Sequence, residues 1–145
     1  MNQENYNIHK VLLDVNVCVD LIANRLLASD IKRKLLSVFH HHDLTVCVPA
    51  FSIDTIFYVL TKLLKIDGSL SKLAIQKLLL NTVLLHTNDE IMSNAFLSTF
   101  NDFEVGLINE HATYYEMDCI ITSNMKDFKK SDLAVYSPND FISLF

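Results

Sequence analysis

The stretch KVLLDVNVCVDLIANR, residues 10–25, decides the fold. Its first part, residues 10–14, is a short apolar run that ends on Asp14, and such a run predicts a strand buried on both faces. Its second part begins a segment, residues 17–27, that carries apolar side chains at helical spacing. A buried strand that leads directly into such a helix is typical of a sheet covered by helices.

The same alternation continues along the chain. Apolar runs predict further strands at residues 45–48, 82–86, 118–122 and 133–137. Helical spacing and capping residues predict helices over 29–42, over 50–65 with Pro49 at its start, over 70–80, after Asn88 or Asp89, from Asn101 or Asp102 to about Tyr115, and after Ser137-Pro138. Turns are predicted at residues 67–71 and 124–130. We therefore expect one domain over residues 1–145, with a three-layer α/β/α fold around a central parallel sheet of four to five strands.

Composition and charge narrow the class of protein. Hydrophobic residues make up 50% of the 145 positions, and only two glycines and two prolines occur, which excludes a disordered or loop-rich chain. The net charge of -5 means that nucleic-acid binding requires local basic patches or a metal ion. The three cysteines are widely spaced in apolar runs, as expected for the reduced thiols of a cytoplasmic protein. No stretch approaches the roughly 20 apolar residues that span a bilayer, so no membrane partner is expected.

Polar side chains follow the predicted strands where ligands bind in open parallel sheets, beyond the carboxyl ends. In chain order the candidates are Asp14, Asp54, Asp102, Glu104, Thr122, Ser123, Asn124 and Asp127. If the first and fourth strands are neighbours, the carboxylates among them converge. Converging carboxylates repel one another in the absence of a cation, and oxygen-rich clusters suit Mg²⁺ or Mn²⁺. Such an ion activates water and stabilises phosphoryl displacement.

Three stretches resemble one known family, in the same order and over nearly the whole chain. KVLLDVNVCVDLIANR resembles the opening of PIN-domain proteins, in which a strand ends in Asp-x-Asn and an apolar helix with a second Asp follows. NDFEVGLINEHA, residues 101–112, resembles the family's acidic helix start, and DCIITSNMKDFKKSDLAVYSPNDFI, residues 118–142, resembles its closing segment. The resemblance implies a Mg²⁺- or Mn²⁺-dependent RNA endonuclease, often the toxin half of a bacterial toxin–antitoxin pair.

The resemblance implies roles for five positions. Asp14 matches the first metal-binding acid and Asp127 the last, while Asn16 matches a residue that helps to hold the site. Thr122 and Asn124 match the polar supports of the last acid.

Two positions depart from the family pattern. The family often has a Glu in the helix after the second strand, and here that position is Thr55, with Asp54 one residue earlier. A third acid commonly follows Asp-Phe-Glu, and here that position is Val105, preceded by Glu104. One residue along a helix rotates a side chain by about 100°. We expect Glu104 to complete the metal set of the two matched acids and Asp54 to assist.

Other residues indicate partners. Lys126, Lys129 and Lys130 flank Asp127 and are candidates for contacts with RNA phosphates. The toxin resemblance implies an antitoxin protein as a partner. A homodimer interface is a further candidate, on the apolar side chains of Leu26, Leu27, Phe96 and Phe100.

Two other classes of protein compete with the ribonuclease. A catalytically degenerate PIN-like module that binds RNA or a protein partner is favoured by Thr55 and Val105, which stand where the family has acids. A receiver-like phosphoacceptor domain shares the alternating pattern, but it needs an Asp at the end of the third strand and a Lys at the end of the fifth. Here the third candidate strand ends in His86, and no Lys ends the last.

Overall fold

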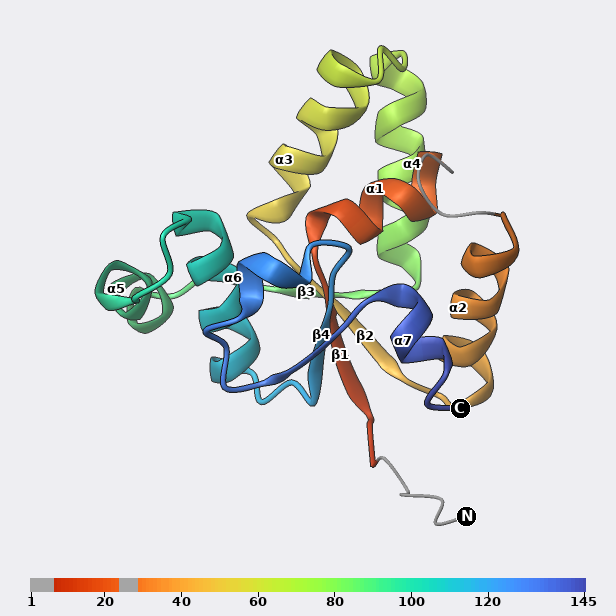
Figure 1. Ribbon diagram of the computed structural model, residues 1–145. Helices are drawn as coiled ribbons and strands as arrows, with labels where there is room; N and C mark the ends of the chain where they lie inside the picture. Colours follow the sequence, from red (N-terminus) through yellow and green to blue (C-terminus); the bar gives the residue numbers. More distant parts are fainter. Residues whose placement is uncertain (1–6, 24–28) are drawn as a thin grey trace.

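A parallel sheet of five strands forms the centre of the protein (Figure 1). The computed structural model describes residues 7–23 and 29–145. The strands are β1 (Lys10–Leu13), β2 (Thr45–Pro49), β3 (Val83–Leu85), β4 (Cys119–Ile121) and β5 (Ala134–Tyr136). They lie in the order β3-β2-β1-β4-β5, and every neighbouring pair is parallel. Because β1 and β4 are neighbours, with Leu13 opposite Ile121, the residues that follow these two strands share one edge of the sheet.

Helices connect the strands. They are α1 (Val15–Ala23), α2 (Ser29–His41), α3 (Ser52–Tyr58), α4 (Gly68–Leu80), α5 (Asp89–Leu97), α6 (Phe103–Tyr114) and α7 (Pro138–Ile142). A π-helical turn, η1 (Val59–Leu63), extends α3, and a 3₁₀ turn, η2 (Met125–Phe128), follows β4. In the described part of the chain no helix is long and apolar enough to cross a membrane.

Side-chain caps fix where four of these helices begin. Asn88 accepts a hydrogen bond from the Ile91 amide at 2.9 Å, and Asp102 and Ser137 cap α6 and α7 in the same way. These three starts were predicted from the sequence. The turn predicted at residues 67–71 was wrong, because Asp67 caps the amides of Ser69 and Leu70 and α4 already begins at Gly68.

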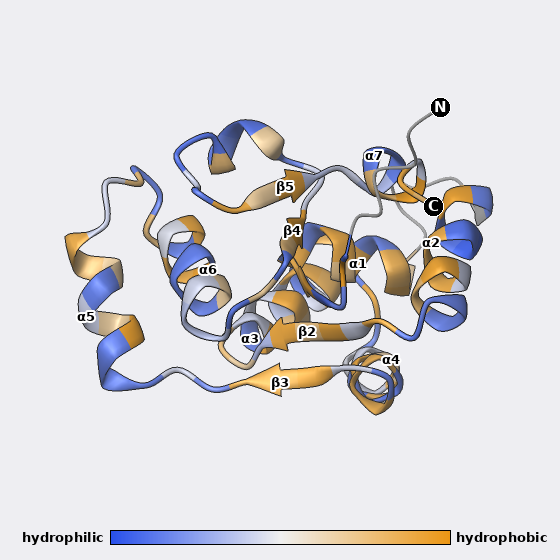
Figure 2. Cartoon of the chain, turned by 90° about the horizontal axis from the view of Figure 1, so that it is seen from below, coloured by the Kyte–Doolittle hydropathy of each residue, from blue (hydrophilic) through white to orange (hydrophobic). Residues whose placement is uncertain are grey.

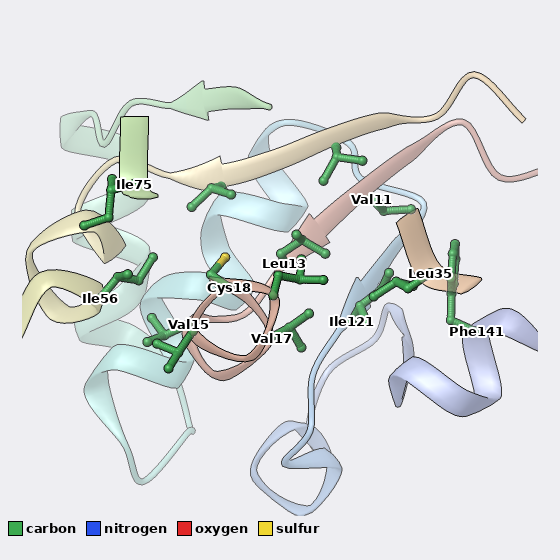
Figure 3. Packing of buried hydrophobic residues seen from close by; sticks show 14 of the residues in the cluster. Val11, Leu13, Val15, Val17, Cys18, Leu35, Ile56, Ile75, Ile121 and Phe141 are labelled. Carbon is green, nitrogen blue, oxygen red and sulfur yellow. The ribbon is translucent and has the colours of Figure 1, made fainter. Parts of the chain in front are cut away.

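The sheet is apolar on both faces, and helices cover each face. On one face, residues such as Leu13 and Ile121 pack against side chains from five helices, among them Cys18, Leu35, Ile56, Ile75 and Phe141 (Figure 3). On the other face, Leu12 and Ile120 pack against Ile108 and Ala112 of α6. Figure 2 shows the strands largely in the colour of hydrophobic residues. The predicted three-layer α/β/α fold with a parallel sheet is therefore confirmed.

Some predicted boundaries move. Pro49 does not start a helix: it ends β2, paired with Leu85, and α3 begins only at Ser52. The segment predicted as a turn at residues 124–130 contains the 3₁₀ turn η2. The three cysteines are buried free thiols. Leu26 and Leu27, two candidates for a dimer interface, lie outside the described residues.

Candidate active site

Asp14 lies directly after β1, at the carboxyl edge of the sheet, and is only 7% exposed. Its Oδ1 accepts a hydrogen bond from the Val15 amide at 2.8 Å, and its Oδ2 accepts one from the Thr122 hydroxyl at 2.7 Å. Its own amide donates to the Ile121 carbonyl at 3.0 Å, which fixes the backbone against β4. Burial raises the pKa of Asp14, the two hydrogen bonds lower it, and the charges of Asp127 and Asp102 raise it.

A chain of hydrogen bonds leads from Asp14 to Asp127. Thr122 is fully buried at the end of β4, and its hydroxyl oxygen accepts a hydrogen bond from the Asn124 amide at 3.0 Å. The Asn124 side-chain amide in turn donates to Asp127 Oδ2 at 2.5 Å. Asp127 lies in the 3₁₀ turn η2, which follows β4, and its side chain is exposed to solvent. Thr122 therefore links a buried acid to an exposed acid.

Glu104 lies in the first turn of α6, close enough to Asp14 and Asp102 for their charges to act on it. Burial raises the pKa of Glu104, and the charges of Asp14 and Asp102 raise it further. Asp102 caps α6, accepting from the Val105 amide at 3.1 Å. The sequence predicted Asp102 both as a possible cap and, together with Glu104, as one of the acids that converge at this edge. Its position as the residue that starts the helix feeding β4 is the signal that places its charge beside the other acids.

The other residues singled out in the sequence are not joined to Asp14 by the hydrogen bonds described above. Asn16 is half-buried in the first turn of α1. Asp54 is exposed in the first turn of α3, and none of the interactions recorded for the described residues joins it to Asp14. Val105, at the position where the family commonly has an acid, is buried in the core cluster that includes Ile120. Thr55 is half-buried.

The donor set fits a hard divalent cation in its chemistry. Carboxylate and amide oxygens are the ligands that Mg²⁺ and Mn²⁺ prefer, and the charges of neighbouring acids raise the pKa of Asp14 and of Glu104. None of the ion pairs within residues 7–23 and 29–145 involves these acids. In the same residues, however, no three His, Cys, Asp or Glu side chains are close enough together to form a metal-binding cluster. The residues thus supply suitable oxygens without a closed coordination shell.

Three lysines border the site. A hollow of about 250 Å³ lies between Asp102, Asp127, Lys126, Lys129 and Lys130. Lys130 Nζ donates to the Thr99 carbonyl at 2.7 Å, and this bond ties the segment after η2 to the loop before α6. The hollow therefore has acids and cations on its walls, an arrangement suited to a phosphate held near a metal ion.

A larger hollow lies away from these acids. It has a volume of about 800 Å³ and is lined mainly by apolar side chains of α2, α4 and the sheet. None of Asp14, Glu104 and Asp127 lines it.

His111 does not belong to the site. It is fully buried, with Nδ1 2.7 Å from the Leu107 carbonyl oxygen and Nε2 2.9 Å from Thr87 Oγ1. The first contact requires a proton on Nδ1, so the Thr87 hydroxyl donates to Nε2. Burial lowers the pKa of His111. The ring is a neutral structural link between α6 and the segment before α5.

Comparison with known proteins agrees with this architecture. A family model described as the PIN domain matches residues 10–126. The chain belongs to the PIN domain family. The predicted resemblance is thus confirmed, and the PIN match runs from the start of β1 to Lys126, one residue before Asp127. No curated protein matches the sequence at a significant level.

Solved structures share the PIN fold at low sequence identity. The VapBC2 structure from Rickettsia felis, bound to a DNA fragment from its promoter, is similar with a TM-score of 0.69 and 15% identity, over 87% of this chain and 96% of that one. DNA-bound VapBC from Salmonella typhimurium is similar with a TM-score of 0.69 and 11% identity, over 90% of this chain and 99% of that one. A toxin–antitoxin complex from Klebsiella pneumoniae is similar with a TM-score of 0.65 and 16% identity, over 88% of this chain and 97% of that one. These likenesses support the fold.

Proposed function

We propose that this PIN-domain protein is a metal-dependent endoribonuclease that hydrolyses RNA phosphodiester bonds. The observation that carries the proposal is the buried carboxylate of Asp14, joined through Thr122 and Asn124 to Asp127 at the carboxyl edge of the sheet. Burying an acid beside other acids is costly. A protein tolerates that cost where the negative charge serves a cation.

Asp14, Glu104 and Asp127 are the proposed ligands of Mg²⁺ or Mn²⁺. A bound ion lowers the pKa of a water molecule and offsets the charge of the attacked phosphate. The Thr122 hydroxyl keeps an oxygen of Asp14 oriented towards the site, and the Asn124 amide does the same for Asp127. Burial and the charges of Asp14 and Asp102 raise the pKa of Glu104, and a bound cation would offset that cost. Asp54 and Asn16 remain predictions as supporting residues.

The test is cleavage of a labelled single-stranded RNA with added Mn²⁺. Asp14→Asn and Asp127→Asn should each lower the cleavage rate at least about 100-fold, because each removes a ligand charge. Asp132→Asn is the matched control, since Asp132 is exposed on the loop before β5. Isothermal titration calorimetry should show that Asp14→Asn and Asp127→Asn also weaken the binding of Mn²⁺. Unchanged cleavage in both would refute the metal mechanism.

A second candidate, a non-catalytic PIN module that binds RNA or a protein, is favoured by one specific observation. Val105 fills the position of a family acid and is buried in the apolar core. Restoring an acid there would place a charge among Leu12 and Ile120. Under this second candidate, the wild-type chain would bind RNA without cleaving it and would show no Mn²⁺ binding in titration.

We also propose an antitoxin-like protein as a partner. The support is the apolar groove of about 800 Å³, with Leu36, Leu70 and Leu73 on its walls exposed by 44% to 61%. Lys32, Lys77 and one acid, Asp43, line the same groove. Because the lysines outnumber the acid, the fitting occupant is a peptide segment with an apolar face and acidic residues. Leu73→Asp should abolish co-purification of such a partner when both are expressed together, while Leu97→Asp, on α5, should not. Retained co-purification of Leu73→Asp would exclude the groove.

A further inference from the structure

Two contacts join the loop before α6, residues 98–102, to the 3₁₀ turn η2 and the residues after it. Lys130 Nζ, two residues beyond η2, donates a hydrogen bond to the Thr99 carbonyl at 2.7 Å. The rings of Phe100 and Phe128 meet edge to face, with centroids 6.5 Å apart and an interplanar angle of 64°. We call these two contacts the clasp.

The clasped loop is packed on both of its sides. Phe128 is only 2% exposed and belongs to the apolar cluster of Ile120, and Phe100 lies partly buried against this cluster. On the other side the loop lies on α6. A Cβ atom added at Gly106 would be 3.2 Å from Ser98 Oγ and 3.4 Å from Phe100 Cβ, so the missing side chain leaves room for the loop. The loop is therefore held between α6 and η2.

The clasp joins the two segments that carry the acids of the proposed site. Asp102 ends the loop and caps α6, and Glu104 follows in the first turn of that helix. Asp127 lies in η2. Asp102 and Asp127 line one hollow of about 250 Å³, and Phe100 and Lys130 line it too. Loss of the clasp would release η2 from the loop and allow the acids on the two segments to move apart.

We propose that Lys130 and Phe100 are positioning residues, which clasp the loop onto η2 and thereby hold Asp127 at a fixed separation from the acids at the start of α6. The inference rests on the proposed function, in that the clasp orders the proposed metal site before a cation binds. Carboxylates at one edge repel one another, so contacts between neutral or cationic groups must restrain the segments that carry them. A set of ligands that is already ordered binds a cation more tightly, because less freedom is lost on binding.

Isothermal titration calorimetry with Mn²⁺, in the absence of RNA, measures the effect on the site. Lys130→Met removes the ammonium group and should weaken Mn²⁺ binding about 10-fold, as the loss of groups that orient metal ligands does. Lys130→Arg can still donate to the Thr99 carbonyl and should restore the affinity. Lys129→Met is the matched control, because Lys129 is exposed and lines the same hollow.

The sign of the change separates the clasp from a simple effect of charge. Removing a positive charge near acids favours the binding of a cation. Lys129→Met should therefore bind Mn²⁺ at least as tightly as the wild type, and charge alone predicts the same for Lys130→Met. Weaker binding in Lys130→Met is the opposite result, and only a change in the position of the acids accounts for it.

Hydrogen–deuterium exchange in EDTA measures the clasp itself, without a bound metal. Exchange over residues 98–102 and 125–130 should become faster in Lys130→Met and in Phe100→Ala, because local opening becomes less costly. It should not change in Lys129→Met. Unchanged exchange in both clasp variants would show that these contacts do not hold the loop, and the inference would fail.

The outcomes separate this inference from the proposed function. A wild-type chain that binds no Mn²⁺ refutes the proposed metal site and the positioning role with it. If the wild type binds Mn²⁺ and Lys130→Met binds it equally well, the positioning role is refuted and the proposed function stands. Weaker RNA binding by Lys130→Met at unchanged Mn²⁺ affinity assigns the ammonium group to RNA phosphates and also overturns the inference.

Discussion

Replacing Thr122 by valine tests the link between the buried acid and the rest of the site. The hydroxyl makes two hydrogen bonds, one to Asp14 Oδ2 at 2.7 Å and one from the Asn124 amide at 3.0 Å. A hydrogen bond to a charged group contributes about 1.5–3 kcal/mol, and a neutral one about 1 kcal/mol. Valine has the same shape and leaves no cavity. Thr122→Val should therefore lower the free energy of unfolding by about 2.5–4 kcal/mol near neutral pH.

The decrease in the free energy of unfolding caused by Thr122→Val should be smaller in acid than at neutral pH. The bond from Thr122 lowers the pKa of Asp14, so removing it raises that pKa further and penalises the ionised carboxylate. The penalty is present above the pKa of Asp14 and shrinks as the carboxyl becomes protonated on acidification. Urea unfolding followed by circular dichroism, near neutral pH and at mildly acidic pH, measures both values. Thr61→Val is the control, since Thr61 donates only to the Phe57 carbonyl on its own helix. An equal loss for the two variants, or one for Thr122→Val that does not shrink in acid, would refute the reasoning.

Three further predictions concern residues around the same edge. Glu104→Gln should raise the free energy of unfolding near neutral pH, because burial and neighbouring acids disfavour the charged form, and urea titrations should show the gain disappearing in acid, where the carboxyl is protonated. Asp102→Ala should cost about 1 kcal/mol in the same assay through loss of the α6 cap, while Asp102→Asn should cost little. Mn²⁺ should raise the melting temperature of the wild type in differential scanning fluorimetry and leave that of Asp14→Asn unchanged.

The fold follows from local patterns in the sequence. The apolar runs around Leu12 and Ile120 predicted strands buried on both faces, and those strands lie side by side at the middle of the sheet. Asp102 and Ser137 predicted helix starts because a capping residue acts on amides within three positions of itself. Pro49 was misplaced because proline is compatible with both a helix start and a strand end, and only its pairing with Leu85 decides between them.

The site was harder to derive than the fold. Topology brings Asp14 near Asp127, and this follows once β1 and β4 are neighbours. Whether a neighbouring acid reaches the same point depends on rotations of about 100° per residue around a helix. Glu104 is near enough to Asp14 for their charges to interact, whereas Val105, one residue on, faces the core. The sequence alone does not give the direction in which each side chain of α6 points, because that direction depends on how the helix packs against the sheet.

The two residues joined at the centre of the site, Asp14 and Thr122, are 108 positions apart in the sequence. During synthesis the first acid leaves the ribosome long before its partner has been added to the chain. Contacts of such long range form late, because closing the intervening loop costs entropy before the contact returns any stability. A growing chain would thus carry no assembled centre until β4 has been translated and has paired with β1.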